Sequence, residues 1–280
     1  MDGRAVAPAA GTVLNALANG YGSAFAIDAH TTATVELDST GAVDGEVAGA
    51  PDADTALIER CVEVVVERFG DGEGGHVRTE SEIPMASGLK SSSAAANATV
   101  LATLDALGVD LDREAACRIG VEAARDTGVT VTGAFDDASA SMLGGVTVTD
   151  NTADALLRHE AVEWDVLVYT PSEQAFSADA DVGRCELIAP IADVVYELAA
   201  EGDYERAMCI NGLAFAAALD RSTEPILEAM PVAAASLSGT GPSYTAVGDR
   251  ETLESVAEHW RRREGNTWLT TTQTDGTRRI

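Results

Sequence analysis

The chain has 280 residues, of which 46% are hydrophobic, and its 46 acidic and 18 basic residues give a formal net charge of −28 and a pI near 4.2. A surface of this charge repels nucleic acid and anionic membranes, and the acidic residues are spread too evenly along the chain to mark one docking face. This composition, with a single lysine and few aromatic residues, is typical of proteins that stay soluble in concentrated salt. It predicts a globular, two-lobed protein from a halophilic cell.

The cysteines and the N-terminus indicate the compartment of the protein. The four cysteines, at positions 61, 117, 185 and 209, form no Cys-x-x-Cys pair and have no histidine at metal-ligand spacing. No basic stretch followed by an apolar run opens the chain, and no segment approaches the roughly 18 consecutive apolar residues of a membrane span. We therefore expect reduced core cysteines, a cytoplasmic location and no membrane partner.

Residues 4–37 read as strands that are separated by small-residue turns. Asn15 lies between these turns, where its amide could line a substrate pocket or could satisfy local backbone groups. A loop over residues 41–54 follows. Apolar residues at helical spacing then predict an amphipathic helix over residues 54–69, and an alternating pattern predicts a strand that ends at Ser81.

The stretch Ser81–Val100 has the features of an anion-binding loop. It passes from a strand end through an Ala-Ser-Gly turn into a helix whose first turn carries three serines. The unpaired N–H groups and the dipole of a helix N-terminus attract phosphate, Gly88 permits close approach, and Lys90 adds a positive charge. The G-x-x-x-x-G-K-[ST] pattern is absent, so a different phosphate loop is predicted. The predicted nucleotide-binding residues are Pro84, Ser87, Gly88, Leu89, Lys90, Ser91, Ser92, Ser93 and Ala94.

The alternative for this stretch is a serine-capped helix that packs tightly in the core through its alanines. Lys90 argues against this alternative, because it is the only lysine in a chain whose other 17 basic residues are arginines. A composition that otherwise excludes lysine places its one ammonium group beside the serine-rich helix start. We therefore favour phosphate binding.

Two adjacent aspartates, Asp136 and Asp137, stand in an otherwise small and apolar segment. They could cap a short helix. They could instead supply a carboxylate that orients a substrate hydroxyl or holds magnesium close to the phosphate loop. Upstream of them, the pattern predicts that the loop helix ends at Gly108 and that Asp112 caps a further helix that carries Glu122.

A second glycine-rich signal, Ser238-Gly-Thr-Gly-Pro242, lies between two apolar strand-like segments. Its N–H groups could clasp an anion and form a second wall of the phosphate site, although a plain hairpin turn would read the same way. A gentle shift in composition suggests a lobe boundary near residue 150. Beyond it, the pattern predicts strands at 164–169 and 267–272 and helices around 184–200, 203–220 and 251–263.

Three motifs in this order resemble those of the GHMP kinase superfamily, which includes galactokinases, homoserine kinases and mevalonate kinases. The segment from Pro84 to Ala94 resembles its phosphate loop, Thr132-Gly-Ala-Phe-Asp-Asp-Ala138 resembles the segment with its catalytic aspartate, and Ser238–Pro242 resembles its third motif. Lys90 departs from the pattern, since most members have glycine there, and the N-terminal Pro-Gly-Lys/Arg motif is missing. This variant, with Asn15-Ala-Leu, is similar to the archaeal type of shikimate kinase.

The resemblance implies an α+β fold with the two lobes of a GHMP kinase, residues 1–150 and 151–280, of which the second is ferredoxin-like, with ATP between them. It implies that Asp136 is the catalytic aspartate and that Lys90 neutralises charge on the transferred phosphoryl group as a second catalytic residue. Ser91 and Glu122 are the implied Mg²⁺ ligands. Substrate contacts are expected from Asn15, Asp137, Gly239, Thr240 and Gly241.

The implied activity is transfer of the γ-phosphoryl group of Mg-ATP to a hydroxyl of shikimate, which gives shikimate 3-phosphate in aromatic amino-acid (chorismate) biosynthesis. The expected partners are ATP and this small molecule, with no nucleic acid and no membrane. Two alternatives stay open: another GHMP kinase that acts on homoserine or mevalonate, and a catalytically silent nucleotide-binding regulator. An arginine is expected to bind the substrate carboxylate, but the sequence does not show which one.

Overall fold

The N-terminal 38 residues form one long hairpin of two strands, where several strands separated by small-residue turns were expected. In the computed structural model, which describes residues 1–83, 87–130, 133–172 and 180–280, β1 (Asp2–Leu14) pairs antiparallel with β2 (Tyr21–Asp38). β2 is long enough to have two neighbours on its other edge. Its second half pairs with β4 (Gly74–Ser81) and its first half pairs with β5 (Val146–Asp150). The start of β2 therefore lies beside the end of β5.

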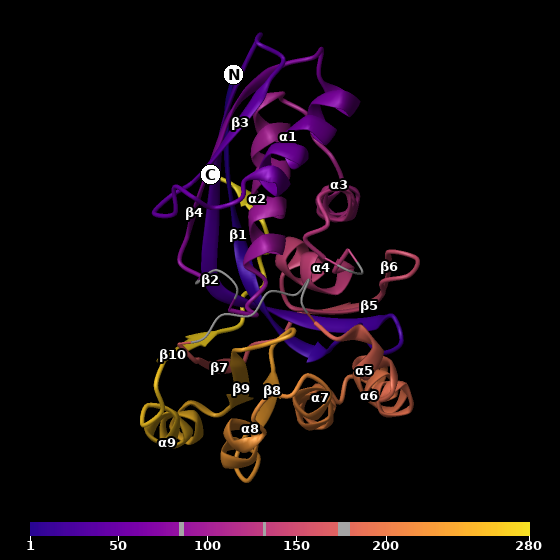
Figure 1. The fold of residues 1–280 in the computed structure, drawn as a ribbon, viewed down its shortest axis with the longest axis vertical. Helices are drawn as coiled ribbons and strands as arrows, with labels where there is room; N and C mark the ends of the chain where they lie inside the picture. The colour runs from indigo at the N-terminus through magenta and orange to yellow at the C-terminus, as the bar shows by residue number, and fades with distance from the viewer. Residues whose placement is uncertain (84–86, 131–132, 173–179) are drawn as a thin grey trace.

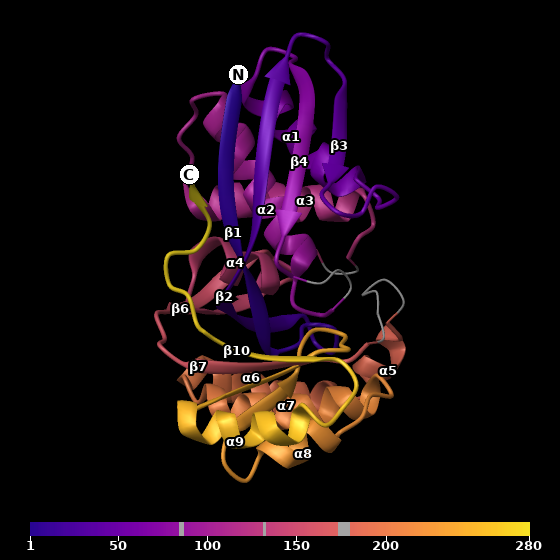
Figure 2. The ribbon, with the colours of Figure 1, turned by 90° about the vertical axis from the view of Figure 1, so that its left-hand side faces the viewer.

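These strands belong to a seven-stranded sheet in the order β11-β1-β2-β4-β3, with β5 and β6 attached through β2. Figure 2 shows β1, β2, β4 and β3 side by side in this order. The remaining members are β3 (Val43–Val47), β6 (Ala155–Glu160) and β11 (Arg278–Arg279). β3 runs parallel to β4 inside the stretch that was expected to be a loop, so that expectation is wrong for residues 43–47. The expected lobe boundary near residue 150 falls between β5 and β6, which pair with each other.

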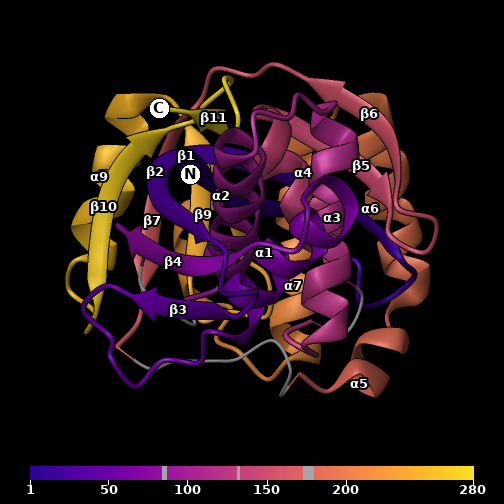
Figure 3. The ribbon, with the colours of Figure 1, turned by 90° about the horizontal axis from the view of Figure 1, so that it is seen from above.

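Four helices cover one face of this sheet (Figures 1 and 3). α2 lies closest, and a Cβ atom at Gly3 of β1 would overlap the carbonyl oxygen of Ala102, so only glycine fits there. The predicted cap of α3 is confirmed, because the Asp112 carboxylate accepts the N–H groups of Glu114 and Ala115. The four helices are α1 (Ala56–Phe69), α2 (Ser91–Ala106), α3 (Arg113–Asp126) and α4 (Phe135–Leu143).

The C-terminal part contains a four-stranded antiparallel sheet in the order β10-β7-β9-β8. Along the chain its elements follow a βαββαβ pattern with the first and third strands in the centre, which is the ferredoxin-like arrangement that was expected. Helices cover its outer face (Figure 1). The strands are β7 (Asp165–Thr170), β8 (Ala234–Leu237), β9 (Tyr244–Gly248) and β10 (Asn266–Thr271). The helices are α5 (Val182–Glu186), α6 (Ala189–Glu201), α7 (Tyr204–Ala218), α8 (Glu224–Ala229) and α9 (Arg250–Trp260).

The cysteines are free thiols, and most of them are buried. Cys61, Cys117 and Cys185 are buried, Cys209 is partly buried, and all four are free thiols. Burial raises the pKa of the Cys61 thiol to about 12, so it stays neutral and packs as a small apolar side chain. Throughout the described ranges, no helix is long and apolar enough to cross a membrane.

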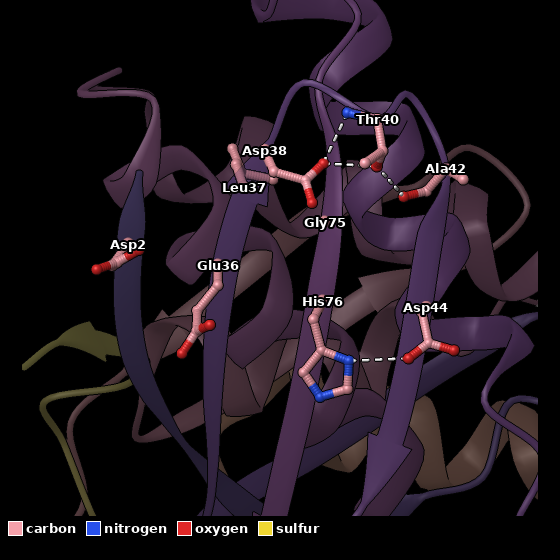
Figure 4. A pocket seen from close by; sticks show the side chains of 9 residues that line it. All are labelled: Asp2, Glu36, Leu37, Asp38, Thr40, Ala42, Asp44, Gly75 and His76. Carbon is pink, nitrogen blue, oxygen red and sulfur yellow. Dashed lines mark hydrogen bonds and ion pairs between the residues drawn. The ribbon is translucent and has the colours of Figure 1, made fainter.

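Among the described residues, every Asp and Glu side chain except that of Asp136 is at least partly exposed. Figure 4 shows one example, an open hollow at the outer end of the seven-stranded sheet, which is lined by Asp2, Glu36, Asp38 and Asp44 together with His76. The only base among these five side chains is His76, whose Nδ1 atom lies 3.0 Å from an Asp44 oxygen. Carboxylates that line one hollow repel one another unless salt screens them.

We therefore expect the free energy of unfolding to rise with KCl concentration. The Debye length falls from about 10 Å at about 0.1 M salt to about 3 Å at about 1 M, which weakens the repulsion within a chain of net charge −28. The midpoint of thermal unfolding should rise by about 10 °C between about 0.1 M and 2 M KCl, or roughly 3 kcal/mol. Circular dichroism measures this midpoint. Sucrose of equal osmolality is the uncharged control, and an equal rise in sucrose would contradict the screening explanation.

Candidate active site

The phosphate loop (residues 87–94) and the glycine turn (residues 238–242) lie against each other. The Ser238 hydroxyl donates to the Gly88 carbonyl oxygen at 2.8 Å, and the Ser243 N–H donates to the Ser87 carbonyl oxygen at 3.0 Å. Gly88 has a φ of 82°, and a Cβ atom there would lie 2.5 Å from the Ser238 carbonyl oxygen. Only glycine fits this close approach. Two of the three motifs therefore form one unit.

The phosphate loop presents the start of α2 without a side-chain cap. Its N-cap residue is Lys90, in the left-handed conformation with a φ of 64°, and the Lys90 side chain makes no capping hydrogen bond. The first-turn N–H groups of Ser91, Ser92 and Ser93 have no acceptor within the helix, as at any helix start. Leu89 and Ala94 are buried beneath the loop. The predicted residue Pro84 lies outside the described residues, as does Thr132 of the second motif.

Lys90 connects all three motifs. Its Nζ atom lies 2.8 Å from an Asp137 carboxylate oxygen, and the two side chains are only 8% and 14% exposed. A Cβ atom at Gly239 would lie 2.9 Å from the same Nζ atom, so the ammonium also faces the glycine turn. A charged pair this far from solvent interacts more strongly than a surface pair. The one lysine of the chain is thus placed between a helix start, a carboxylate and a glycine-rich turn.

Asp136 and Asp137 lie in the first turn of α4. The N-cap of this helix is Ala134, so the alternative that the aspartates cap a helix is wrong. Asp136 is 4% exposed. Its carboxylate accepts a hydrogen bond from Asn151 Nδ2 at 2.7 Å, and a Cβ atom at Gly22 would lie 2.5 Å from its Oδ2 atom. A buried carboxylate held in this way fits a functional role better than a surface cap.

Asn15 and Thr12 hold the glycine turn from β1 and the residues that follow it. Asn15 Nδ2 donates to the Gly239 carbonyl oxygen at 2.9 Å, and the Gly239 N–H donates to the Thr12 hydroxyl at 2.8 Å. The Asn15 side-chain oxygen accepts the N–H of Leu17 at 3.0 Å. Both ends of the amide therefore serve backbone groups, which matches the alternative to a substrate contact. Thr240, between the two glycines of the turn, is buried.

Glu122 lies away from these contacts. Its carboxylate pairs with Arg68 of α1, and both side chains are more than 40% exposed. In the part of the chain that the structure describes, no three His, Cys, Asp or Glu side chains are placed to hold a metal ion together. The arrangement gives Glu122 a surface ion pair, so the site proposed below does not use it.

The sequence comparisons identify the family of the chain. The N-terminal domain of the GHMP kinases matches residues 56–145. The chain is 64% identical to a shikimate kinase of Halobacterium salinarum, over 99% of both chains. It is 56% identical to a shikimate kinase of Methanothrix thermoacetophila, over 93% of this chain and 90% of the other. The chain belongs to the archaeal shikimate kinases of the GHMP kinase family.

Solved structures of GHMP kinases have the same fold. Homoserine kinase from Cytophaga hutchinsonii superimposes with a TM-score of 0.76 at 15% identity, covering 100% of this chain and 97% of that one. Galactokinase from Lactococcus lactis gives a TM-score of 0.76 at 12% identity, covering 100% and 95%. The expected α+β fold of a GHMP kinase is confirmed over the whole chain, as is its expected identity as a kinase of this family.

Two residues that contact Asp136 in this GHMP kinase, Asn151 and Gly22, were not expected at the site. Asn151 lies at the expected lobe boundary near residue 150, where Asp150-Asn151-Thr152 has the sequence of a typical turn. Gly22 lies within β2, in the stretch over residues 4–37 where small residues were expected to form turns. A polar residue directly after a buried strand, such as Asn151 after β5, was the one available signal.

Asp137 has an unusual acidity in this setting. Burial, together with the charge of Asp136, raises the pKa of Asp137 from an ordinary 3.8 to about 7, although the Lys90 ammonium opposes the rise. The folded protein therefore binds this proton more tightly than the unfolded chain does. The contribution of Asp137 to the free energy of unfolding falls as the pH rises from about 4 to about 7 and stays low above that.

The free energy of unfolding should therefore depend on pH through the Asp137 carboxyl group. We expect the free energy of unfolding of the wild type, relative to that of Asp137→Asn, to decrease between pH 5 and about pH 7 and then to level off. Denaturant unfolding at constant molar KCl measures the difference. Asp110→Asn, at a fully exposed carboxylate, is the control and should give a constant difference. A constant difference for Asp137→Asn as well would contradict the raised pKa.

Proposed function

We propose that this kinase transfers the γ-phosphoryl group of ATP to a hydroxyl of shikimate and forms shikimate 3-phosphate. The observation that carries the proposal is the 64% identity, over 99% of both chains, to a protein named shikimate kinase. The geometry supports it, because a helix start, an ammonium group and a buried carboxylate converge within three contacting motifs. ATP is a cytoplasmic metabolite, so we place the reaction in the cytoplasm, in a salt-adapted cell.

The phosphate loop and the glycine turn would hold the nucleotide phosphates. The N–H groups at the start of α2 and the Lys90 ammonium offer positive charge where the β- and γ-phosphates would lie. Mg²⁺ usually binds through one or two protein oxygens together with substrate phosphates and water, so the absence of a carboxylate cluster in the described residues is compatible with it. We propose that the Ser91 hydroxyl oxygen binds Mg²⁺. The metal ion would neutralise charge on the phosphates.

Asp136 would act on the acceptor. We propose that its carboxylate orients the shikimate hydroxyl and takes up the proton as the oxygen attacks the γ-phosphorus atom in line with the leaving ADP. Asp137, held 2.8 Å from Lys90, would fix the ammonium at the phosphate side of the site. Gly239, Thr240 and Gly241 would form the wall opposite the phosphate loop. Catalysis then rests on positioning and charge neutralisation.

Arg221 is our candidate for binding the shikimate carboxylate. It lies between α7 and α8, and a Cβ atom at Gly241 would lie 3.4 Å from its Nε atom, so the guanidinium borders the glycine turn. The backbone N–H of Arg221 donates to the Ala216 carbonyl oxygen at 2.8 Å, and the Tyr244 hydroxyl donates to the Ser222 carbonyl oxygen at 2.8 Å. These two hydrogen bonds fix the backbone that carries Arg221. A guanidinium matches a carboxylate with two parallel hydrogen bonds.

Replacing Arg221 by leucine should therefore raise KM for shikimate by about 10- to 100-fold, since hydrogen bonds to a charged group contribute about 1.5–3 kcal/mol. KM for ATP should stay within about threefold of the wild type. Steady-state kinetics with each substrate varied in turn measure both values. Arg206→Leu, on the exposed surface of α7, is the matched control. A rise in KM for ATP alone would assign Arg221 to the phosphates instead.

The proposed function is tested by a coupled ADP-release assay in molar KCl with Mg-ATP. Shikimate, homoserine and mevalonate are offered in parallel wells, and the product of the active well is identified by mass spectrometry. We expect turnover with shikimate alone. Turnover with another alcohol only would replace the substrate and keep the kinase. A folded protein that binds ATP and turns over none of them would be the silent regulator.

A further inference from the structure

Asp136 is held by a residue outside all three motifs. Asn151, which is 3% exposed, donates from Nδ2 to Asp136 Oδ1 at 2.7 Å. Its Oδ1 atom accepts the backbone N–H of Asp136 at 3.1 Å and the Thr149 hydroxyl at 2.7 Å. Asn151 thus binds both the side chain and the backbone of the proposed catalytic residue.

The orientation of the Asn151 amide follows from its partners. The backbone N–H of Asp136 can only donate, so it must face the oxygen of the amide. The nitrogen is then left to face the carboxylate, which can only accept when it is ionised. The opposite orientation would place two donors together and an oxygen against the carboxylate. The hydrogen bond to Asp136 Oδ1 is therefore a consequence of the local chemistry.

The other side of the Asp136 carboxylate faces the backbone of β2. The register between β2 and β5 sets Gly22 opposite Thr149, two residues before Asn151. A Cβ atom at Gly22 would lie 2.5 Å from both the Cβ and the Oδ2 atoms of Asp136. The carboxylate is thus confined between a bare strand on one side and an amide on the other.

The turn that carries Asn151 is itself fixed to α3. The Asn151 N–H donates to the Gly20 carbonyl oxygen at 2.9 Å. Arg125 pairs with both Asp154 carboxylate oxygens, at 2.6 and 2.7 Å, and Arg118 donates two hydrogen bonds to the Asp154 carbonyl oxygen, at 3.0 and 3.2 Å. A turn held at both ends can hold an amide in one position, which is what a positioning residue requires.

We propose that Asn151 is a positioning residue, which holds the Asp136 carboxylate in the orientation that receives the proton of the acceptor hydroxyl. This inference rests on the proposed function, in which Asp136 acts on the acceptor. Asn151 also has a structural role, because its Oδ1 atom satisfies an N–H group at the start of α4. The two roles use different atoms of the amide, so substitutions can separate them.

Asn151→Asp is the variant that separates them, because it keeps the oxygen that serves the helix start and replaces the donor by a second carboxylate oxygen. We expect kcat at pH 8 to fall by about 10²- to 10³-fold, the range set by misplacing a catalytic group, with KM for ATP within about threefold. Two carboxylates in contact share one proton, which restores the donor. The ratio of variant to wild-type kcat should therefore rise as the pH falls from 8 to 6.

Asn97→Ala is the matched control. Asn97 is also fully buried, and its Nδ2 atom donates to the Ala138 carbonyl oxygen in the same helix at 2.9 Å, but no hydrogen bond joins it to Asp136. We expect this variant to lose thermal stability and to keep kcat within about threefold, whereas Asn151→Ala should lose kcat with no rescue at low pH. Gly22→Ala places a methyl group against the Asp136 carboxylate and leaves Asn151 intact. This variant should also lower kcat.

Retention of kcat in both Asn151 variants would overturn the inference, as would losses in Asn97→Ala and Asn151→Ala that follow thermal stability alone. A pH-independent ratio for Asn151→Asp would leave only the structural role and would also overturn it. If the wild type turns over another alcohol and not shikimate, only the proposed substrate is wrong. The Asn151 and Asn97 variants are then compared with that alcohol as the acceptor. A wild type without turnover on any alcohol would overturn both.

Discussion

Asp136→Asn should lower kcat with shikimate by about 10²- to 10⁴-fold, the range over which a positioned base contributes. The new amide has nearly the shape of the carboxylate, and its oxygen can still accept the hydrogen bond from Asn151, so the fold should be kept. What is lost is the negative charge and the capacity to take the proton of the acceptor hydroxyl. KM for both substrates should change by less than about threefold, because the loss lies in the transition state. The ADP-release assay measures both constants.

Glu122→Gln is the matched control for that result, since it also replaces a carboxylate by an amide. Glu122 pairs with Arg68 at the surface, so we expect kcat and the Mg²⁺ concentration for half-maximal activity to stay unchanged. A loss of activity that excess Mg²⁺ restores would return Glu122 to the metal site. An active Asp136→Asn enzyme would remove the base and leave positioning as the only source of rate.

Local sequence was sufficient to predict the phosphate loop and the glycine turn. Gly88 and the serines that follow it reveal a helix start, and Ser238-Gly-Thr-Gly reveals a turn, because turn geometry depends on a few adjacent residues. Their contact depends on the pairing of distant strands, so the residues alone offered it only as one of two alternatives, a second wall of the phosphate site or a plain hairpin turn. The resemblance to the GHMP kinases supplied the ferredoxin-like second sheet, whose strand order no local pattern specifies.

The contacts of Asn151 and Gly22 with Asp136 could not be predicted either, because they too depend on the pairing of distant strands. Asn151 follows Asp136 by 15 positions and Gly22 precedes it by more than a hundred, and only the β2–β5 register brings them together. Glu122 shows the reverse difference between expectation and packing. The resemblance to the family implied a metal ligand there, whereas the packing of α3 beside α1 directs its carboxylate to Arg68. β3 was missed because five residues among glycines and aspartates give too short a periodic signal.

Lys90→Met should lower kcat/KM for ATP by about 10²- to 10³-fold, the loss that follows removal of one donor aimed at developing charge. Methionine has a similar length and is apolar, so the substitution removes the ammonium without leaving a large cavity. It also leaves Asp137 without its counter-ion in a site where the carboxylate is only 14% exposed. Breaking such a pair destabilises a protein by about 3–5 kcal/mol unless the remaining group becomes neutral.

The double variant Lys90→Met/Asp137→Asn separates stability from catalysis. Removing both charges relieves the unpaired carboxylate, so thermal stability should return toward that of the wild type, while kcat/KM for ATP should stay low. If activity returned together with stability, Lys90 would serve only to neutralise Asp137. If Lys90→Met alone kept normal turnover, the ammonium would have no role at the transferred phosphoryl group, and the N–H groups of α2 with Mg²⁺ would have to supply the charge neutralisation by themselves.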